Sequence, residues 1–240
     1  MPEAGQEDRK RVLVIDDDAL LIRLIEHNLG QIGIEVLKAY AGYEGISMVR
    51  SRQPDLVILD IVLPDIDGWD VLQRIRQISK VPILMLTIKE KEEDIVQALE
   101  QGADDYCTKP VGMKELIARV EAIFRRASLY KSRRQDGFTD GFLSINMAEQ
   151  KILKEGTEIR LTPMEFNLVQ YLLTKEGQFI KSREILSSVW GAEYVDDVDL
   201  LRTCIWQVRR KLEPIPSQPR YIINRPGFGY RFNRSVPSAR

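Results

Sequence analysis

Short apolar runs alternate with segments of helical periodicity through the first half of the chain. Inner strands of a parallel sheet read as continuous apolar runs, as in RVLVI, LVIL and PILML, whereas apolar residues three and four positions apart are typical of helices. The alternation occurs five times and predicts an α/β fold, a doubly wound parallel sheet covered by helices on both faces. The predicted strands are 11–16, 35–40, 55–60, 81–87 and 104–109, and the predicted helices are 19–29, 43–50, 69–76, 93–102 and 112–127.

The second half of the chain has a different texture. Short strand-like segments come first, then three helical segments, then two strands around a Pro-Gly-Phe-Gly turn. Thr162, Pro163 and Glu165 have the spacing of a capping box, which predicts that a helix begins there and runs to Gly177. Ser182 is the expected cap of the second helix, and the third covers 198–214. This order predicts an α+β domain, with strands at 141–146, 151–156 and 157–162.

Charge separates the two halves. Residues 1–124 carry 15 Lys/Arg and 23 Asp/Glu, a net charge of −8. Residues 125–137 have a net charge of +4, and residues 138–240 have +3. An acidic half joined through a basic segment to a basic half predicts two domains with different partners. We expect a disordered tail at 1–9, a first domain at 10–126, a linker at 127–137, a second domain at 138–234 and a tail at 235–240.

Composition excludes several classes of protein. No apolar run approaches the roughly 20 residues that span a membrane, and the polar first ten residues do not resemble a signal peptide. Cys107 and Cys204 lie far apart, which favours free thiols in a reducing cytoplasm. His27 is the single histidine, so a histidine-rich metal site is excluded. A cytoplasmic protein without a membrane partner is predicted.

Polar residues gather where the predicted parallel strands end: Asp16 and Asp17, then Asp60, Thr87 and Lys109. The carboxyl ends of such strands meet at one edge of the sheet, where functional groups collect. Three carboxylates there repel one another unless a hard cation such as Mg²⁺ binds between them. A hydroxyl and an ammonium nearby would bind phosphoryl oxygens, and a carboxylate can itself be the nucleophile. Each element alone is as readily a turn or a helix cap, but together they favour a phosphoryl site.

The segments VLVIDDD, VILDIVLPDIDGWDVL, PILMLT and GADDYCTKP resemble the receiver domain of two-component response regulators over residues 10–126. The resemblance implies a flavodoxin-like sheet of order 2-1-3-4-5, and a phosphoryl group passed from a sensor histidine kinase to Asp60. Its Mg²⁺ would be held by Asp16, Asp17, Asp60 and the backbone carbonyl of Val62. Thr87 and Lys109 would bind the phosphoryl oxygens, and Tyr106 would be the switch aromatic. Asp18 matches no ligand position and is expected to cap the first helix.

The third helix of the second half carries a candidate contact surface. Leu201, Cys204, Ile205, Val208 and Leu212 form one apolar stripe. The opposite face is predicted to expose a tryptophan among residues suited to base edges, flanked by cations suited to phosphates. The alternative is a solvated basic face. The predicted contact residues are Thr203, Trp206, Gln207 and Arg210, flanked by Arg202, Arg209 and Lys211.

The segments LTPMEFNLVQYLL, SREILSSVWG, VRRKLE and NRPGFGYRF are similar to the winged-helix DNA-binding domain of the OmpR/PhoB family over residues 138–234. The resemblance implies that the third helix enters the major groove of promoter DNA and that Arg225 on the wing reaches the minor groove. It also implies that the loop at 191–199 contacts RNA polymerase. Phosphorylation would strengthen a receiver dimer, through Asp94, Ile95, Glu100, Asp104, Asp105, Glu115 and Arg119.

Two alternatives to a phosphorylation-controlled regulator remain. A phosphatase would also use an aspartate nucleophile and Mg²⁺, but usually has a second aspartate two positions on, where this chain has Val62. We therefore expect no enzyme activity beyond self-catalysed phosphoryl transfer to Asp60 and slow autodephosphorylation. The other alternative is a regulator that binds DNA without phosphorylation and uses its receiver only to dimerise.

Overall fold

The structure is a computed structural model that describes residues 9–87, 101–129, 137–175 and 177–234, without the side chains of Thr87 and residues 126–129. Its internal contacts divide the chain into two compact units, Met1–Glu121 and Ala122–Arg240. The helix α5 (Met113–Leu129) crosses that division. Each unit is described by itself.

A five-stranded parallel sheet forms the centre of the first unit. Its order is β2-β1-β3-β4-β5, which confirms the predicted sheet and its order. Each strand begins and ends within three residues of its predicted limits. The strands are β1 (Arg11–Ile15), β2 (Glu35–Ala39), β3 (Leu56–Asp60), β4 (Ile83–Thr87) and β5 (Asp105–Thr108).

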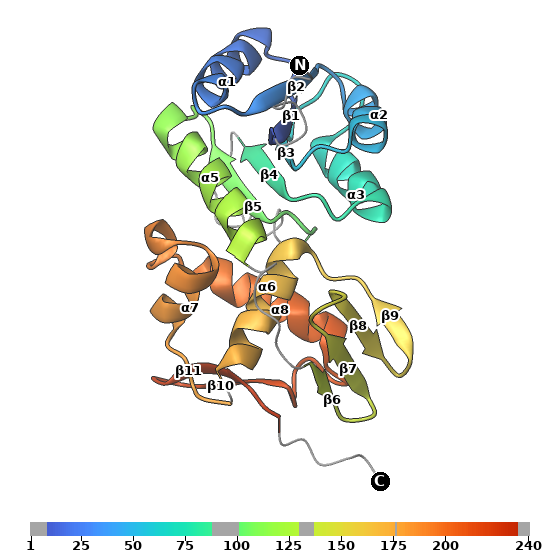
Figure 1. The fold of residues 1–240 in the computed structure, drawn as a ribbon, viewed down its shortest axis with the longest axis vertical. Helices are drawn as coiled ribbons and strands as arrows, with labels where there is room; N and C mark the ends of the chain where they lie inside the picture. The colour runs from blue at the N-terminus through green and yellow to red at the C-terminus, as the bar shows by residue number, and fades with distance from the viewer. Residues whose placement is uncertain (1–8, 88–100, 130–136, 176, 235–240) are drawn as a thin grey trace, which may run out of the picture. The chain divides into compact units, whose positions relative to one another are not determined.

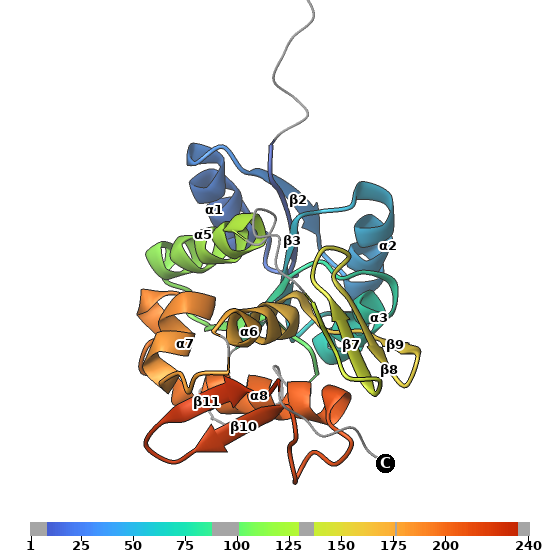
Figure 2. The same ribbon diagram turned by 60° about the horizontal axis from the view of Figure 1, so that its bottom comes forward.

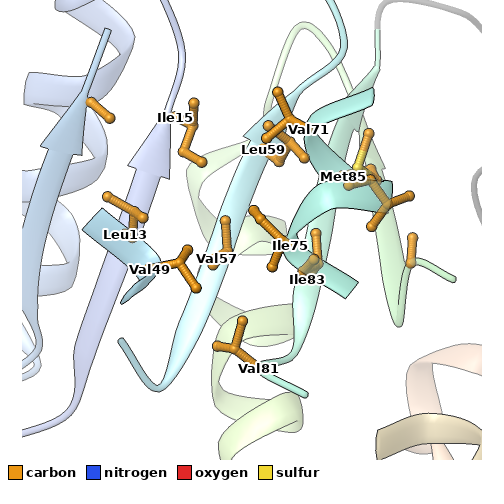
Figure 3. Packing of buried hydrophobic residues seen from close by; sticks show 13 residues of the cluster. Leu13, Ile15, Val49, Val57, Leu59, Val71, Ile75, Val81, Ile83 and Met85 are labelled. Carbon is orange, nitrogen blue, oxygen red and sulfur yellow. The ribbon is translucent and has the colours of Figure 1, made fainter. Parts of the chain in front are cut away.

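Helices cover both faces of this sheet, α1 (Ala19–Gln31) and α5 on one side and α2 (Gly42–Arg52) and α3 (Gly68–Ile78) on the other (Figure 1). The helix predicted at 93–102 lies almost wholly outside the described residues. Alternate side chains of the inner strands pack against α2 and α3, as Figure 3 shows for Leu13, Val57 and Ile83. All three are fully buried, so the strand ends are held by a closely packed core.

Aspartates cap three helices of the first unit, α1, α2 and α3. Asp18 accepts hydrogen bonds from the N–H groups of the first turn of α1, as predicted, and Asp67 caps α3. The N-cap position of α2 is Ala41, which has no side-chain acceptor. Asp65, from the loop between β3 and α3, takes this role by accepting the N–H groups of Gly42 (2.7 Å) and Tyr43 (2.9 Å). The loop that follows Asp60 is thereby tied to a second helix.

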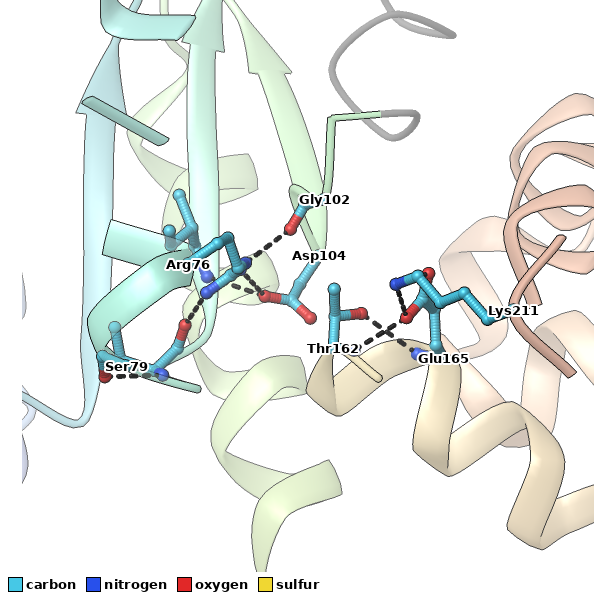
Figure 4. Close-up of polar contacts among 9 residues, drawn as sticks. Arg76, Ser79, Gly102, Asp104, Thr162, Glu165 and Lys211 are labelled. Carbon is cyan, nitrogen blue, oxygen red and sulfur yellow. Dashed lines mark hydrogen bonds and ion pairs between the residues drawn. The ribbon is translucent and has the colours of Figure 1, made fainter. Parts of the chain in front are cut away.

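Arg76 of α3 ties the start of β4 to the start of β5. Its guanidinium donates to the carbonyls of Val81 (2.5 Å) and Gly102 (2.8 Å) and to the Asp104 carboxylate (2.6 Å; Figure 4). Asp104 is 2% exposed and also accepts the N–H of Ile83. The prediction that Asp104 lies on an interaction surface is therefore wrong, because its carboxylate satisfies buried donors of its own unit.

The second unit is α+β, as predicted, with an antiparallel sheet, three helices and a terminal hairpin (Figure 2). The strand β6 was not predicted, because two residues carry no periodicity. The sheet contains β6 (Phe138–Thr139), β7 (Leu143–Asn146), β8 (Lys151–Lys154) and β9 (Thr157–Ile159). The helices are α6 (Pro163–Thr174), α7 (Ser182–Val189) and α8 (Val198–Leu212), with a 3₁₀ turn at Ala192–Tyr194, and the hairpin pairs β10 (Ile222–Arg225) with β11 (Gly229–Phe232).

Two helix limits differ from the predictions. The capping box of Thr162 and Glu165 is present, but α6 ends at Thr174 because Lys175 already leaves helical geometry. The expected cap of α7, Ser182, is instead its first helical residue. The cap position is occupied by Lys181, which makes no capping side-chain bond within the described part of the chain.

Buried polar contacts fix α8 within the second unit. Glu165 closes the capping box and also forms an ion pair with Lys211, whose Nζ lies 2.5 Å from Glu165 Oε2 (Figure 4). Glu213 is 1% exposed and accepts the backbone N–H groups of Arg220, Tyr221 and Ile222. This carboxylate connects the end of α8 to the start of β10.

Candidate functional site

Three carboxylates converge at the carboxyl edge of the parallel sheet. Asp16 and Asp17 follow β1, and Asp60 is the last residue of β3. Each offers one oxygen within 4.8 Å of the others. Asp16 and Asp60 are buried, whereas Asp17 is exposed. The predicted convergence of these residues is confirmed, because β1 and β3 are hydrogen-bonded neighbours in the sheet.

Lys109, directly after β5, bridges two of these carboxylates. Its Nζ donates to Asp16 Oδ2 and Asp60 Oδ2, both at 2.8 Å. Burial opposes the charge of this ammonium, but the hydrogen bonds to Asp16 and Asp60 outweigh burial, and the pKa of Lys109 is raised. Burial also raises the pKa of Asp60, helped by the charge of Asp16 and opposed by the hydrogen bond from Lys109. The carboxyl groups of Asp16 and Asp60 are therefore held close together by the ammonium of Lys109.

The backbone after Asp60 is shaped by a close approach at Gly68. A Cβ at Gly68 would lie 2.3 Å from the carbonyl oxygen of Asp60, a distance that no side chain allows. The Gly68 N–H donates to the Ile61 carbonyl at 2.8 Å, which closes the loop between them. Val62 lies in this loop and is 58% exposed. The loop is short and is fixed at both ends by these contacts.

The donor chemistry of the cluster fits a hard divalent cation. The convergent ligands are carboxylate oxygens, which Mg²⁺ prefers, and the exposed Asp17 leaves the cluster accessible to water. One oxygen of Asp60 and one of Asp16 are already held, by the Ile61 N–H (2.8 Å) and the Asp18 N–H (2.9 Å). Because these bonds orient both carboxylates, they favour one arrangement of ligands.

Two further residues of the predicted phosphoryl site lie on the neighbouring strands. Thr87 is the last residue of β4, next to Thr108 of β5, and its side chain lies outside the described part of the structure. Tyr106 lies on β5 and is partly buried, with the Arg119 guanidinium 5.6 Å from its ring centroid. Thr87 therefore stands at the carboxyl edge of the sheet, whereas Tyr106 lies two residues before the end of β5.

The residues predicted for a receiver dimer fall into two groups. Asp94, Ile95 and Glu100 lie outside the described residues. Arg119 of α5 pairs within its own chain, with Asp105 at 3.0 Å and with Glu115 at 2.7 Å. Asp105 is fully buried and Glu115 is exposed. Arg119 and Glu115 therefore remain candidates for a surface contact, whereas Asp105 supports Arg119 from beneath.

The structure narrows the predicted contact face of α8. The apolar stripe is buried as predicted, but the buried arc extends to Thr203 (7% exposed) and Gln207 (5% exposed). The prediction that these two side chains line the exposed face is wrong, because α8 packs against both α6 and α7 and more than one side is covered. Arg202, Trp206 and Arg210 remain exposed, four residues apart along one line of the helix.

Two predicted cations of α8 are engaged inside the unit. Both Nε and Nη2 of Arg209 donate to the carbonyl of Ile222, and burial lowers the pKa of Arg209. Lys211 pairs with Glu165. Neither is kept as a proposed contact, because each already satisfies an acceptor of the fold.

The hairpin β10–β11 presents Arg225 with an aromatic support that sequence reasoning missed. The Arg225 guanidinium lies 4.3 Å from the ring centroid of Phe228, which is 52% exposed and contacts Phe179 edge to face. Arg231 lies over the other ring, 4.7 Å from the centroid of Phe179. The signal for Phe228 was a large apolar residue between two glycines of a turn. The two rings contact each other and each has one guanidinium over it, an arrangement that orients Arg225.

Family models match both halves of the chain. Residues 12–121 match the response regulator receiver domain, and residues 156–232 match the C-terminal domain of transcriptional regulatory proteins. Neither is a family of conventional enzymes, which removes the phosphatase alternative. The matches place the acid cluster in the first family and the exposed line of α8 in the second.

Relatives and solved structures match nearly the whole chain. The transcriptional regulatory protein KdpE of Mycobacterium tuberculosis is 38% identical over 221 residues, covering 92% of this chain and 98% of that protein. The probable transcriptional regulator ycf27 of Porphyridium aerugineum is 40% identical, covering 94% and 97%. A structure of the RitR mutant C128S has a TM-score of 0.79 at 25% identity, covering 94% and 100%. DrrB of Thermotoga maritima, described as an OmpR/PhoB homologue, has a TM-score of 0.50 at 26% identity, covering 93% and 99%.

Within the described residues, no helix combines the length and apolar character needed to cross a membrane.

Proposed function

Because this chain belongs to the OmpR/PhoB family of response regulators, and is thus a two-component transcriptional regulator, we propose that Asp60 is the site of its phosphorylation. The observation that carries the proposal is the convergence of Asp16, Asp17 and Lys109 on this buried carboxylate. The phosphodonor would be a phosphohistidine of a sensor histidine kinase.

The reaction needs little movement of the protein. A carboxylate oxygen of Asp60 attacks phosphorus, the bond from phosphorus to the imidazole nitrogen breaks, and the bonding electron pair leaves with the imidazole. Lys109 then stabilises negative charge on a phosphoryl oxygen, and the Thr87 hydroxyl donates to another. Because Lys109 already contacts Asp60, it is in place before phosphate arrives.

Asp16, Asp17, Asp60 and the Val62 carbonyl are the residues that we propose to hold Mg²⁺. When bound, the ion would neutralise the carboxylates and the phosphoryl oxygens. The residues themselves contribute the preset orientation described above, through the backbone donors of Asp18 and Ile61.

Phosphorylation would act on the second unit through dimerisation. We propose a receiver dimer that involves Asp94, Ile95, Glu100, Glu115 and Arg119, with Tyr106 as the switch residue that responds to Thr87. Two receivers held together would place two DNA-binding units on adjacent half-sites and raise their effective concentration. Arg202, Trp206 and Arg210 would contact the major groove, Arg225 the minor groove, and the loop at 191–199 RNA polymerase.

The substitution Asp60→Asn tests the phosphorylation site. The variant keeps the size of the side chain but removes the nucleophile, so transfer from a radiolabelled histidine kinase should fall below detection while the far-ultraviolet circular dichroism stays unchanged. Asp70→Asn, at an exposed position of α3, is the matched control and should accept phosphate as the wild type does. Transfer to the Asp60→Asn variant at the wild-type rate would exclude Asp60.

The same variant separates this proposal from a regulator that works without phosphorylation. In a gel-shift assay with promoter DNA, beryllofluoride and Mg²⁺ should tighten binding of the wild type and leave Asp60→Asn unaffected. Equal binding of both proteins under both conditions would favour the phosphorylation-independent alternative.

A further inference from the structure

The exposed line of α8 has an unusual composition for a surface that meets DNA. Once Thr203 and Gln207 are buried, the groups that remain are two guanidiniums with an indole between them. Trp206 is 43% exposed, although it is a large apolar side chain. A half-exposed tryptophan leaves apolar surface in contact with water, which is unfavourable in free energy. A partner that covers this surface removes the unfavourable contact.

Arg210 is oriented beside this indole, and Arg202 is oriented by an ion pair. The Arg210 guanidinium lies 5.7 Å from the centroid of the Trp206 ring, and Arg202 is held by Asp199 at 2.9 Å. Residues four apart rise about 6 Å along a helix, close to two base-pair steps of about 3.4 Å. The three side chains can therefore meet positions about two base-pair steps apart along one groove, with the apolar group in the middle.

Base chemistry limits what an indole can recognise in a major groove. Guanine presents two acceptors that suit the donor fork of arginine, whereas the C5-methyl group of thymine is the apolar feature of the groove. Trp206 has no acceptor for adenine or cytosine amino groups, because its single polar atom is a donor.

We propose that Trp206 is a specificity-determining residue that covers a thymine methyl group in the major groove, about two base-pair steps from a guanine contacted by Arg202 or Arg210. This inference rests on the proposed DNA-binding function and adds the identity of the base that is read. The phosphate contacts of the domain do not depend on it.

Replacement of thymine by deoxyuridine tests the inference, because it removes only the methyl group. Binding sites are first selected from random DNA with the full-length protein, Mg²⁺ and beryllofluoride, and each thymine of the selected half-site is then replaced singly. At one thymine, deoxyuridine should weaken binding of the wild type about fourfold, the value of one buried methyl group. Trp206→Ala should bind the thymine and deoxyuridine duplexes equally, whereas Trp206→Phe should keep part of the preference.

Controls distinguish base reading from a structural effect. Ile215→Ala, which removes an exposed apolar side chain outside α8, should discriminate thymine from deoxyuridine as the wild type does. Replacing the guanine contacted by Arg202 or Arg210 with 7-deazaguanine should weaken binding of the wild type and of Trp206→Ala alike. A thymine preference that survives in Trp206→Ala at every position, or the lack of any such preference in the wild type, would overturn the inference alone. Failure to select any sequence would overturn the proposed DNA-binding function itself.

Discussion

Asp65 shows how a single side chain can serve a helix to which it does not belong. The first turn of α2 leaves N–H groups that Ala41 cannot satisfy, and Asp65 satisfies two of them from the loop after β3. Burial opposes its charge, but the hydrogen bonds from Tyr43 and Gly42 together outweigh burial and lower the pKa of Asp65. The carboxylate therefore links the loop after β3 to α2 most strongly while it is ionised.

We expect Asp65→Ala to lower the free energy of unfolding of the first unit by about 1 kcal/mol at pH 7, the usual cost of losing an N-cap. A lowered carboxyl pKa stabilises the folded state above the unfolded pKa, and this contribution is lost as the pH falls through the folded pKa. The difference between wild type and variant, measured by urea unfolding, should therefore shrink below pH 3.8. A difference that stays constant down to pH 2 would contradict this account.

Among single residues, the sequence predicted the positions of those that are fixed by the topology of the sheet. Asp16, Asp60 and Lys109 had to meet, because the ends of neighbouring parallel strands meet wherever the sheet forms. The partner of Asp65 could not be predicted, since its N–H donors lie 22 and 23 residues away along the chain. The prediction that Thr203 and Gln207 are exposed was wrong for a related reason, because a helical periodicity does not reveal how many neighbours a helix will have.

Among the elements, α8 depends on buried polar contacts at its carboxyl end. Glu213 accepts three backbone N–H groups of the segment that leads into β10, and Lys154 of β8 donates to the carbonyls of Lys211 and Glu213. These contacts set the direction of the chain between α8 and the hairpin. They were not predictable, because a glutamate before Pro214 is also typical of an ordinary helix end.

Glu213→Gln should destabilise the second unit by about 2 kcal/mol, because the amide nitrogen cannot accept a hydrogen bond and leaves a buried N–H unpaired. Urea unfolding followed by circular dichroism should show the loss, with Glu149→Gln, an exposed position, as the matched control. We also expect weaker DNA binding, because the hairpin carrying Arg225 follows this turn. If Glu213→Gln were as stable as the wild type, the three hydrogen bonds would make no net contribution to the free energy of unfolding.

At the scale of the whole molecule, Arg119 would make contacts within its own chain and also contribute to the proposed receiver dimer. In the single chain this guanidinium is shared between Asp105 and Glu115. We expect Arg119→Ala to reduce dimerisation in the presence of beryllofluoride and Mg²⁺ at least fivefold, a coupling of about 1 kcal/mol, while phosphoryl transfer to Asp60 continues. Sedimentation velocity measures the first and radiolabel transfer the second. Arg74→Ala, on α3, is the control, and a dimer unaffected by Arg119→Ala would remove this residue from the interface.

The charge of the two halves predicts how DNA binding responds to salt. Residues 138–240 carry a net charge of +3, and the first 124 carry −8, so contacts with phosphate are expected from cations of the second unit. The proposed minor-groove contact of Arg225, at the hairpin tip, would lie close to phosphates, whereas the proposed contacts of Arg202 and Arg210 are with bases. Loss of one phosphate contact lowers the slope of log K against log salt by about 1.

Arg225→Ala should therefore weaken binding to selected and unrelated duplexes alike and reduce that slope by about 1. Arg202→Ala should weaken binding to the selected duplex more than to unrelated DNA, because a base contact distinguishes sequences and a phosphate contact does not. Fluorescence anisotropy between 50 and 300 mM salt, roughly the range in which phosphate contacts dominate, measures both quantities, with Lys151→Ala of β8 as the control. If Arg225→Ala instead changed the preferred sequence and left the slope unchanged, the hairpin would read bases, and the Phe228 support would then orient Arg225 for specificity.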